Sequence, residues 1–549
     1  MVHFYTSLSS LAVVAAVALA LLFKLQSTSQ PEELSYQRLQ INVADPDGAV
    51  QHLAKVLSFP TLASRGAPNS IVNPEPFQQL HQYLQTTYAT VYQRLKVELV
   101  HDFSLLFTWE GADPTLKPIL LMSHLDVVPA PTKGPSYNWT YPPFSGTVAD
   151  GYIWGRGALD VKIGVVSLLE AVTELLRQDF KPRRTIYLAF GHDEEVGGPY
   201  GYASYNLRMT VGGSCELSGP PVVGAHGLAL LLQSRGVQLE LVLDEGGIVL
   251  SDGIKASGLT LVDKPLALIG TAEKGFETWE LHITGTGGHS SMPPVGTDSV
   301  ASRLSRVLAD LLANPPPASL IHPVIDWTKA VGAAVRQTPL RLLLQNSDNK
   351  LLRPLLAQAL TQAGDDIAAL VRTTCGVVGI QAGGIADNVL PTSGTVKLNF
   401  RLLPGDNSSV VRQYLQSATH KHKEYVQIEA LNPDENKAPD VTPSDGPHFQ
   451  LIKQAIMETL APPEGMVVAP YLLTGTTDSR YYGSVVPIAA GRVFRFLPQF
   501  LSRGEGDIRR IHGVDERVGV DDYLRGIGFY LRFIQLAASD ASDEERAVA

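Results

Sequence analysis

The chain contains few cysteines, only Cys215 and Cys375 among its 549 residues. Two thiols exclude a cysteine-built zinc knuckle and a disulfide framework, and leave a single bridge between them open. The chain also lacks a basic stripe and carries a net charge of -10, which argues against a nucleic-acid-binding protein. Hydrophobic residues make up 44% and charged residues 18%, an ordinary balance for globular domains with large cores. The length favours more than one domain, and the sequence contains no internal repeats.

One long apolar run occurs, at residues 4–23 (FYTSLSSLAVVAAVALALLF). Twenty helical residues span about 30 Å, the thickness of a bilayer core. The uninterrupted apolar part, Leu11–Phe23, has the length of a signal-peptide core, but no basic segment precedes it. We therefore expect a signal anchor at 1–26, with a cleaved signal peptide as the alternative. Either would place the rest of the chain in a vacuolar or secretory lumen, attached to the membrane if uncleaved. Two glycosylation sequons agree with that compartment: Asn138-Trp139-Thr140 and Asn407-Ser408-Ser409.

Several short apolar segments have no polar face and end in acids or histidines. They are Pro118–Met122 (PILLM), Thr185–Phe190 (TIYLAF) and Leu239–Leu243 (LELVL). Continuous apolar strands that alternate with helical segments are typical of a parallel sheet covered on both faces. The pattern predicts an α/β fold with a mostly parallel sheet.

The pattern changes at Gly275. Phe276–Thr284 (FETWELHIT) alternates apolar and polar residues, as a half-exposed strand does. The segments that follow predict the order βαββαβ, a compact two-layer domain inserted into the larger one. The predicted organisation is a stalk at 27–46, a catalytic domain at 47–274 and 433–538, a lid or dimerisation domain at 275–432 with a helical insertion at 318–372, and a disordered tail at 539–549.

Five residues at strand ends and glycine turns are candidate metal ligands: His124, Asp160, Glu195, Asp244 and His512. Imidazole nitrogen and carboxylate oxygen are ligands that zinc accepts. One bridging carboxylate, with one histidine and one carboxylate on each side, would hold two zinc ions. Glu194 would remain as a general base, and Asp126 could orient the ring of His124. Each residue taken singly has an ordinary explanation as a surface or core side chain, so the prediction depends on the set.

The motifs SHLDVVP, GRGALDVK, GHDEEVGG, DEGG, TGTGGHSSMPP and IHGVDERV resemble those of a dinuclear-zinc metallopeptidase family. This family includes carboxypeptidase S, aminoacylase, glutamate carboxypeptidase and acetylornithine deacetylase. The resemblance covers residues 47 to about 540. The segments WTYPPFSG and EKGFETWEL look closest to carboxypeptidase S and the N-fatty-acyl-amino-acid synthase/hydrolases. The resemblance implies a zinc-peptidase catalytic domain with a ferredoxin-like lid.

The resemblance also implies roles for individual residues. His124 and Asp244 would hold one zinc, Glu195 and His512 the other, and Asp160 would bridge the two. Glu194 would be the base, and His289 would donate a hydrogen bond to the oxyanion. Asn388 and Arg401 would bind substrate from the lid, and backbone N–H groups around Thr476 would meet its carboxylate. The chain departs from the family at Val161, where relatives usually carry a second aspartate after the bridging one.

The expected function is zinc-dependent hydrolysis of an amide next to a free carboxylate, by a metal-bridged hydroxide and a glutamate base. The substrate would be a small peptide or an N-acyl amino acid, and an N-fatty-acyl-amino-acid synthase/hydrolase is the alternative within this class. A catalytically silent binding protein of the same fold is the alternative of another class. The lid could form a homodimer and deliver His289 to a neighbouring active site, or the 318–372 insertion could keep the chain monomeric.

Overall fold

A computed structural model describes residues 36–39, 41, 43–132, 134, 138–197, 207–209, 215–217, 222–256, 259–296, 298–336, 338–383, 386–431, 437–485 and 492–539. The apolar run at 4–23 and nearly all of the tail predicted at 539–549 lie outside these residues. Among the residues described, no helix combines the length and the apolar composition needed to cross a bilayer. Cys375 carries a free thiol, and the side chain of Cys215 lies outside the described part of the structure.

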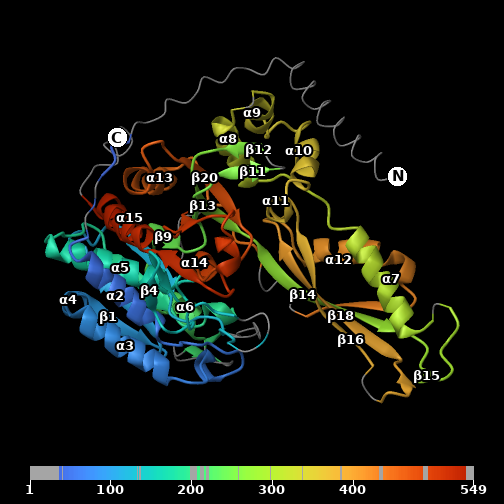
Figure 1. The fold of residues 1–549 in the computed structure, drawn as a ribbon. Helices are drawn as coiled ribbons and strands as arrows, with labels where there is room; N and C mark the ends of the chain where they lie inside the picture. Colours follow the sequence, from blue (N-terminus) through green and yellow to red (C-terminus); the bar gives the residue numbers. More distant parts are fainter. Residues whose placement is uncertain are drawn as a thin grey trace.

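A ten-stranded sheet forms the centre of the larger domain (Figure 1). Its order is β1-β2-β6-β3-β9-β21-β13-β10-β22, with β20 also paired to β13. The central neighbours β6, β3, β9 and β21 are parallel, whereas β1 and β2 are antiparallel at one edge. The fold class predicted from the apolar runs, α/β with a largely parallel sheet, is confirmed. The strands are β1 (Lys96–Val100), β2 (Ser104–Trp109), β3 (Ile119–His124), β6 (Ile186–Gly191), β9 (Leu241–Asp244), β10 (Val249–Leu250), β13 (Leu266–Glu273), β20 (Val467–Leu473), β21 (Val493–Arg495) and β22 (Phe500–Leu501).

Helices cover both faces of this sheet, which explains why its strands are apolar throughout. On β3, Leu121 belongs to a core with α2, α5, α13 and α15, whereas Leu120 and Met122 belong to a core with α6 on the other face. Successive side chains of a strand point to opposite faces, so both faces must be apolar. The helices of this domain are α2 (Pro46–Leu57), α3 (Glu75–Thr87), α4 (Ala89–Arg94), α5 (Lys162–Arg177), α6 (Gly224–Ser234), α13 (Pro447–Thr459), α14 (Ser479–Val485) and α15 (Val520–Ala538).

The inserted domain projects from the sheet as a separate lobe (Figure 1). Its antiparallel sheet has the order β16-β18-β14-β19, and α7 and α12 pack against it. Along the chain the order is βαββαβ, as expected for a ferredoxin-like lid. The lobe begins directly after β13, because Lys274 alone separates β13 from β14. Its elements are β14 (Gly275–Thr284), α7 (Val300–Ala313), β16 (Thr374–Ala382), β18 (Ser393–Leu402), α12 (Ser408–Ala418) and β19 (Val426–Ala430).

Four helices between α7 and β16 form the helical insertion. Its apolar side chains, among them Val324, Trp327 and Leu356, pack with β13 and β20 of the central sheet. The insertion therefore extends the larger domain, although it interrupts the lid in sequence. The helices are α8 (Val324–Ala334), α9 (Thr338–Gln345), α10 (Arg353–Leu360) and α11 (Asp365–Leu370).

Candidate metal centre and active site

The candidate site lies at the carboxyl ends of three adjacent parallel strands. His124 is the last residue of β3, Glu194 and Glu195 follow β6, and Glu245 follows β9. Because β6, β3 and β9 are neighbours, their carboxyl ends meet at one edge of the sheet, where open α/β folds bind ligands. Asp160 comes from the loop before α5. His512 comes from the loop between the short helix η4 (Asp507–Arg510) and strand β23 (Arg517–Gly519).

These side chains form two groups that share Asp160. In the first group, the Nε2 atom of His124 lies 3.1 Å from Oδ1 of Asp160 and 3.2 Å from Oε1 of Glu245. In the second, the Nε2 atom of His512 lies 3.0 Å from Oδ2 of Asp160 and 3.0 Å from Oε2 of Glu195. The two oxygens of Asp160 thus face different groups, which is the arrangement of a bridging carboxylate.

The spacing of the donor atoms fits a tetrahedral cation. Ligand atoms about 2.0–2.1 Å from a zinc ion lie roughly 3.3 Å from one another. The contacts of 3.0–3.2 Å within each group are close to that separation. Each group supplies one imidazole nitrogen and two carboxylate oxygens, a donor set that zinc accepts. The residues therefore fit two adjacent divalent cations.

The charges at the site also favour cations. Burial, with a smaller contribution from the charge of neighbouring Asp160, raises the pKa of Glu245 to about 8 and that of Glu195 to about 7, against the opposing charge of His124. Hydrogen bonds with Asp160 and Glu195 raise the pKa of His512 to about 10. Burial alone would raise the pKa of Asp160, but the two histidines outweigh it and lower that pKa. Several buried carboxylates held together in this way repel one another, and bound cations would relieve that repulsion.

Asp126 positions His124 and also the two glutamates, Glu194 and Glu195. The Nδ1 atom of His124 donates a hydrogen bond to the backbone oxygen of Asp126 at 2.9 Å, so the neutral ring presents an unprotonated Nε2 to the site. The carboxylate of Asp126 accepts the N–H groups of Glu194 and Glu195, at 3.2 and 3.1 Å. The sequence predicted an orienting role for its carboxylate. In the structure the backbone oxygen makes the shorter contact with Nδ1, and the carboxylate oxygen Oδ1 also lies 3.4 Å from it while accepting from the loop after β6.

Glu194 lies beside the two groups without completing either. Its Oε2 atom is 4.0 Å from Nε2 of His124. Burial raises its pKa well above the usual value, and the charges of Glu245, Asp478 and Glu195 add to that effect. A carboxylate at this place can exchange a proton with a molecule held between the two groups.

The structure does not place Asp244 where the sequence predicted a ligand. The Oδ2 atom of Asp244 accepts the N–H of Ser479 at 2.8 Å, and Oδ1 accepts the N–H of Glu245. Glu245, one residue further along, faces His124 instead. Adjacent side chains at a strand end point in opposite directions, so a shift of one residue exchanges their surroundings. The motif DEGG contains both Asp244 and Glu245, and its spacing does not indicate which of the two faces the metal site.

The loop 474–480 (TGTTDSR) is fixed mainly to the protein itself. The N–H of Thr477 donates to Glu273 at 3.0 Å, and the N–H of Ser479 donates to Asp244. Two of the backbone N–H groups in the loop that the sequence predicted to bind the substrate carboxylate therefore already donate hydrogen bonds within the protein. Thr476 itself is half-buried at the turn of this loop.

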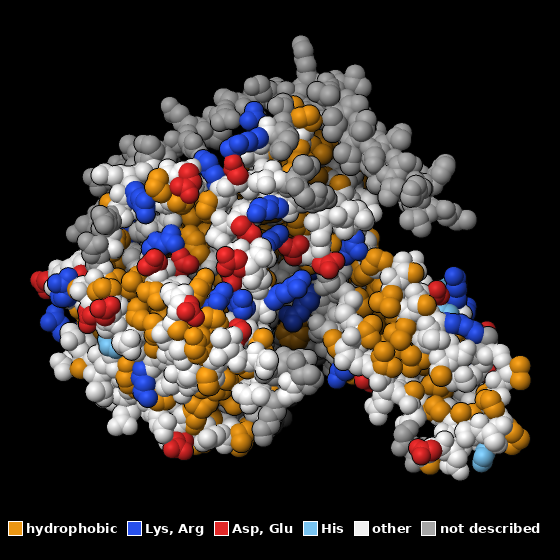
Figure 2. All heavy atoms as spheres, in the orientation of Figure 1, with side chains coloured by type: hydrophobic (Ala, Val, Ile, Leu, Met, Phe, Trp, Pro, Cys, Tyr) orange, Lys and Arg blue, Asp and Glu red, His pale blue; other side chains and the backbone are white. Residues whose placement is uncertain are grey.

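Cationic side chains face the site from the lid and from this loop. Burial lowers the pKa of Arg401, and neighbouring Arg480 lowers it further, while the charge of Glu194 opposes this. Arg401 also lies over the ring of Phe276, 5.4 Å from its centre. Lys and Arg side chains gather in the recess between the larger domain and the lid (Figure 2). Sequence reasoning missed Arg480, although it stands in the same TGTTDSR motif.

His289 and Asn388 do not lie at the metal groups of the same chain. His289 belongs to the short strand β15 (Gly288–His289), which pairs with β17 (Val389–Leu390) at the far end of the lid (Figure 1). The backbone oxygen of Asn388 accepts the N–H of Ser290, and both predicted residues are exposed. Their place depends on how the lid is oriented, which no local motif encodes.

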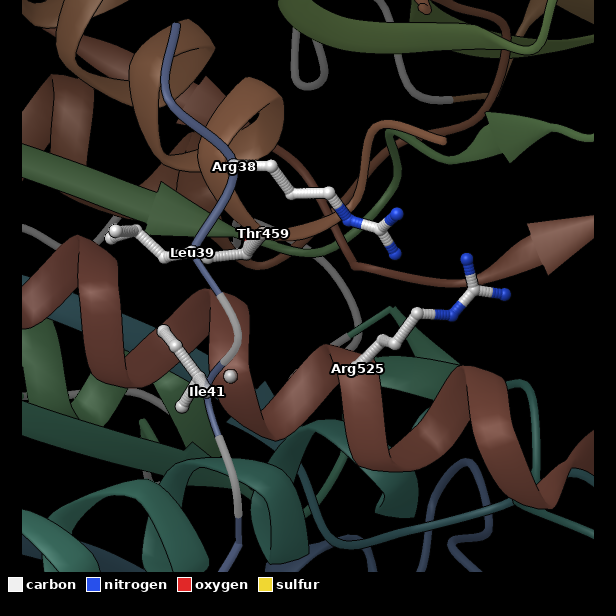
Figure 3. A pocket seen from close by; sticks show the side chains of 6 residues that line it. Arg38, Leu39, Ile41, Thr459 and Arg525 are labelled. Carbon is white, nitrogen blue, oxygen red and sulfur yellow. The ribbon is translucent and has the colours of Figure 1, made fainter. Parts of the chain in front are cut away.

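A separate cavity of about 430 Å³ lies between the segment Arg38–Ile41 and helices α13 and α15 (Figure 3). The guanidinium groups of Arg38 and Arg525 both face it. Arg525 already donates to Asp522 and lies over the ring of Phe500. None of the candidate ligands lines this cavity.

A largely parallel sheet with two histidine–carboxylate groups at its carboxyl edge defines a class, the metal-dependent hydrolases. The profile of peptidase family M20/M25/M40 matches residues 120–536. The chain therefore belongs to this family of metallopeptidases and related hydrolases, as its motifs predicted.

Similar proteins agree on the family. The chain is 34% identical over 489 residues to a probable carboxypeptidase S-like 2 from Dictyostelium discoideum, covering 88% of this chain and 84% of that protein. It is 32% identical over 499 residues to the human N-fatty-acyl-amino acid synthase/hydrolase PM20D1, covering 89% and 87%. Among solved structures, human carnosine dipeptidase 1 matches with a TM-score of 0.58 at 15% identity, covering 90% of this chain and 96% of that one. At that identity the likeness shows the fold alone.

Proposed function

We propose that the protein is a two-zinc amidohydrolase that cleaves an amide bond next to a free carboxylate. The observation that carries this proposal is the place of Asp160, whose two oxygens face His124 on one side and His512 on the other. One zinc would be held by His124, Asp160 and Glu245, and the other by Asp160, Glu195 and His512. This assignment replaces Asp244 of the sequence prediction with Glu245.

When bound, two adjacent zinc ions activate water and polarise the carbonyl group of the scissile amide. The contribution of the chain is to place a proton acceptor beside them. Glu194 would accept a proton from the attacking water and then donate it to the nitrogen of the leaving amine. Its position, held by the hydrogen bond from its own N–H to Asp126, supports this role.

Arg401 and Arg480 support a substrate that carries a free carboxylate. Arg480 lowers the pKa of Arg401 and Glu194 raises it, so the two cations lie near each other and near Glu194, and a bound anionic group would lower their repulsion. The guanidinium group of an arginine can bind a carboxylate with two hydrogen bonds. We assign Arg401 to the substrate carboxylate, with the Thr476 loop as a further contact, and Asn388 would reach the substrate only from the lid of a second copy.

Two substrates have this carboxylate: a peptide with a free C-terminus and an N-acyl amino acid. The names of the relatives support both, because carboxypeptidase S-like proteins and N-fatty-acyl-amino acid synthase/hydrolases match over similar lengths. A blocked dipeptide and N-oleoyl-phenylalanine, assayed side by side with added zinc, separate the two. Cleavage of neither substrate by protein that carries about two zinc ions per chain would contradict the proposal.

The exposed position of His289 supports a dimer. A histidine at the far end of the lid cannot reach the metal groups of its own chain in this arrangement, but it could enter the site of a second copy. We propose that the lid pairs with another lid and that His289 then donates a hydrogen bond to the oxyanion in the neighbouring site.

The apolar run at 4–23 supports entry into a secretory or vacuolar lumen. If the run is not cleaved, it supports a form of the protein that stays attached to the membrane.

A further inference from the structure

The loop that carries Asp160 is organised around one buried carboxylate, that of Glu516, which is fully buried. Its Oε1 atom accepts three backbone N–H groups, those of Gly157 at 3.0 Å, Leu159 at 2.7 Å and Asp160 at 3.1 Å. Three N–H groups that converge on one charged oxygen fix the course of a loop strongly. The backbone of the shared ligand Asp160 is therefore set by a side chain from the other end of the chain.

The second oxygen of Glu516 is paired with Arg156, which is 2% exposed. The Nη1 atom of Arg156 lies 2.5 Å from Oε2 of Glu516. Its Nη2 atom donates to the backbone oxygens of His512, at 3.2 Å, and Gly513, at 3.0 Å. One guanidinium thus connects the carboxylate that orders the Asp160 loop with the backbone of the His512 loop, 356 residues away in the chain.

His512 needs such an anchor because packing does not hold it. Its side chain is 52% exposed, and its backbone has a φ of 59°, in the left-handed region. Besides Arg156, the loop is held by Asp515, whose carboxylate accepts the N–H and the hydroxyl of Thr140 at 2.6 and 2.8 Å. The position of His512 relative to Asp160 therefore depends on hydrogen bonds to its backbone.

We infer that Arg156 and Glu516 are a positioning pair for the zinc proposed between Asp160, Glu195 and His512, and that this pair affects the affinity of that zinc more than the affinity of the other. The inference rests on the proposed function. Neither residue touches the reacting atoms. The other proposed zinc shares Asp160 with this site, but its remaining ligands, His124 and Glu245, stand at the ends of β3 and β9 and do not use the connection to His512. Outer partners of metal ligands typically change metal affinity about 10–100-fold when they are replaced.

Two substitutions break different parts of the pair. Glu516→Gln keeps an oxygen for the backbone N–H groups but turns an amide toward Arg156. Arg156→Lys keeps a positive charge but loses the fork that reaches both Glu516 and the His512 backbone. A matched control is Glu458→Gln, which removes an ion pair with Arg532 between α13 and α15, neither residue being a candidate ligand or a partner of one. His512→Ala serves as the reference for loss of the second zinc.

The experiment measures zinc content after dialysis against a weak chelator, zinc titration of the metal-free protein, and the melting temperature of each metal-free variant. Glu516→Gln and Arg156→Lys should retain about one zinc per chain, as His512→Ala does, and the weaker titration step should shift roughly 10–100-fold. Excess zinc should restore kcat with KM unchanged.

Wild-type zinc affinity in both variants would overturn the inference and leave the proposed function intact. Equal weakening of both titration steps, together with a fall in melting temperature like that of Glu458→Gln, would also overturn it. Wild-type protein that binds no zinc would instead refute the proposed function.

Discussion

The Nε2 atom of His124 lies 3.2 Å from the Oε1 atom of Glu245, whereas the neighbouring Asp244 accepts a hydrogen bond from the backbone of Ser479. Glu245→Ala should therefore remove one zinc and lower kcat at least 100-fold, because it deletes a ligand. Asp244→Asn should keep both zinc ions, since an amide oxygen can still accept the N–H of Ser479. Zinc content and kcat of the two variants check this. Loss of zinc from Asp244→Asn with retention in Glu245→Ala would restore the assignment made from the sequence.

Glu194 offers a test of chemistry without metal loss. Glu194→Gln should lower kcat about 10²–10⁴-fold, the usual contribution of a general base, while zinc content stays at the wild-type level. The substitution removes the proton acceptor but conserves size and the N–H bonded to Asp126. Steady-state kinetics with zinc analysis of the same sample measures both quantities. A variant that turns over at the wild-type rate would exclude Glu194 as the base.

Much of this site could be predicted from the sequence because its chemistry lies at strand ends. Apolar runs that end at His124 and before Glu195 indicate buried strands, and parallel strands bring their carboxyl ends together. The choice between Asp244 and Glu245 could not be made, since both follow β9 and a shift of one residue reverses the direction of a side chain.

Other features depend on the assembled fold. The remote place of His289 on β15 follows from the orientation of the whole lid, which the GGHS motif does not encode. The pairing of Arg156 with Glu516 joins residues 360 positions apart, and neither residue stands in a pattern that predicts its partner. Local periodicity carries no information about such contacts.

His289 provides a test of the dimer. His289→Ala should lower kcat about 10²–10³-fold, the usual effect of losing an oxyanion donor. If His289 acts in the neighbouring site, mixing His289→Ala with Glu194→Gln creates dimers in which one site has both residues. Subunit exchange should then restore roughly a quarter of the wild-type activity, because half of the dimers are mixed and each has one complete site. No recovery in mixtures whose subunits demonstrably exchange would show that His289 does not act in the neighbouring site.

Arg401 should determine recognition of the substrate carboxylate. Arg401→Lys keeps the charge but loses the two-pronged hydrogen bond, so kcat/KM for an acid substrate should fall about 10–100-fold, the value of a charged hydrogen bond. The methyl ester of the same substrate, which has no charge to bind, should be affected much less. Arg412→Lys, on the same lid, is the matched control, since Arg412 lies over the ring of Trp279. An equal fall in kcat/KM for the acid and the ester would show that Arg401 does not recognise the carboxylate.

His192 should make stability depend on pH below neutrality. It is fully buried, its ring nitrogens contact the hydroxyl of Ser104 at 2.7 Å and the backbone oxygen of Asn69 at 3.1 Å, and burial lowers its pKa to about 4. The unfolded chain protonates this ring near the ordinary pKa of about 6.5, so between these values the unfolded state binds more protons. The contribution of His192 to stability is therefore retained above pH 6.5 and lost as pH falls, by about 2 kcal/mol between pH 7 and pH 5.

Urea unfolding of His192→Gln should show a correspondingly smaller loss of stability over that range. The glutamine amide can donate to Asn69 without titrating, so the variant removes the protonation and keeps one hydrogen bond. The exposed His420 gives the control, because His420→Gln should leave the pH dependence of wild type unchanged. All variants are compared in a zinc chelator, since protonation of the metal-binding side chains then contributes equally to each. A wild-type slope in His192→Gln would mean that this ring is already charged in the folded protein.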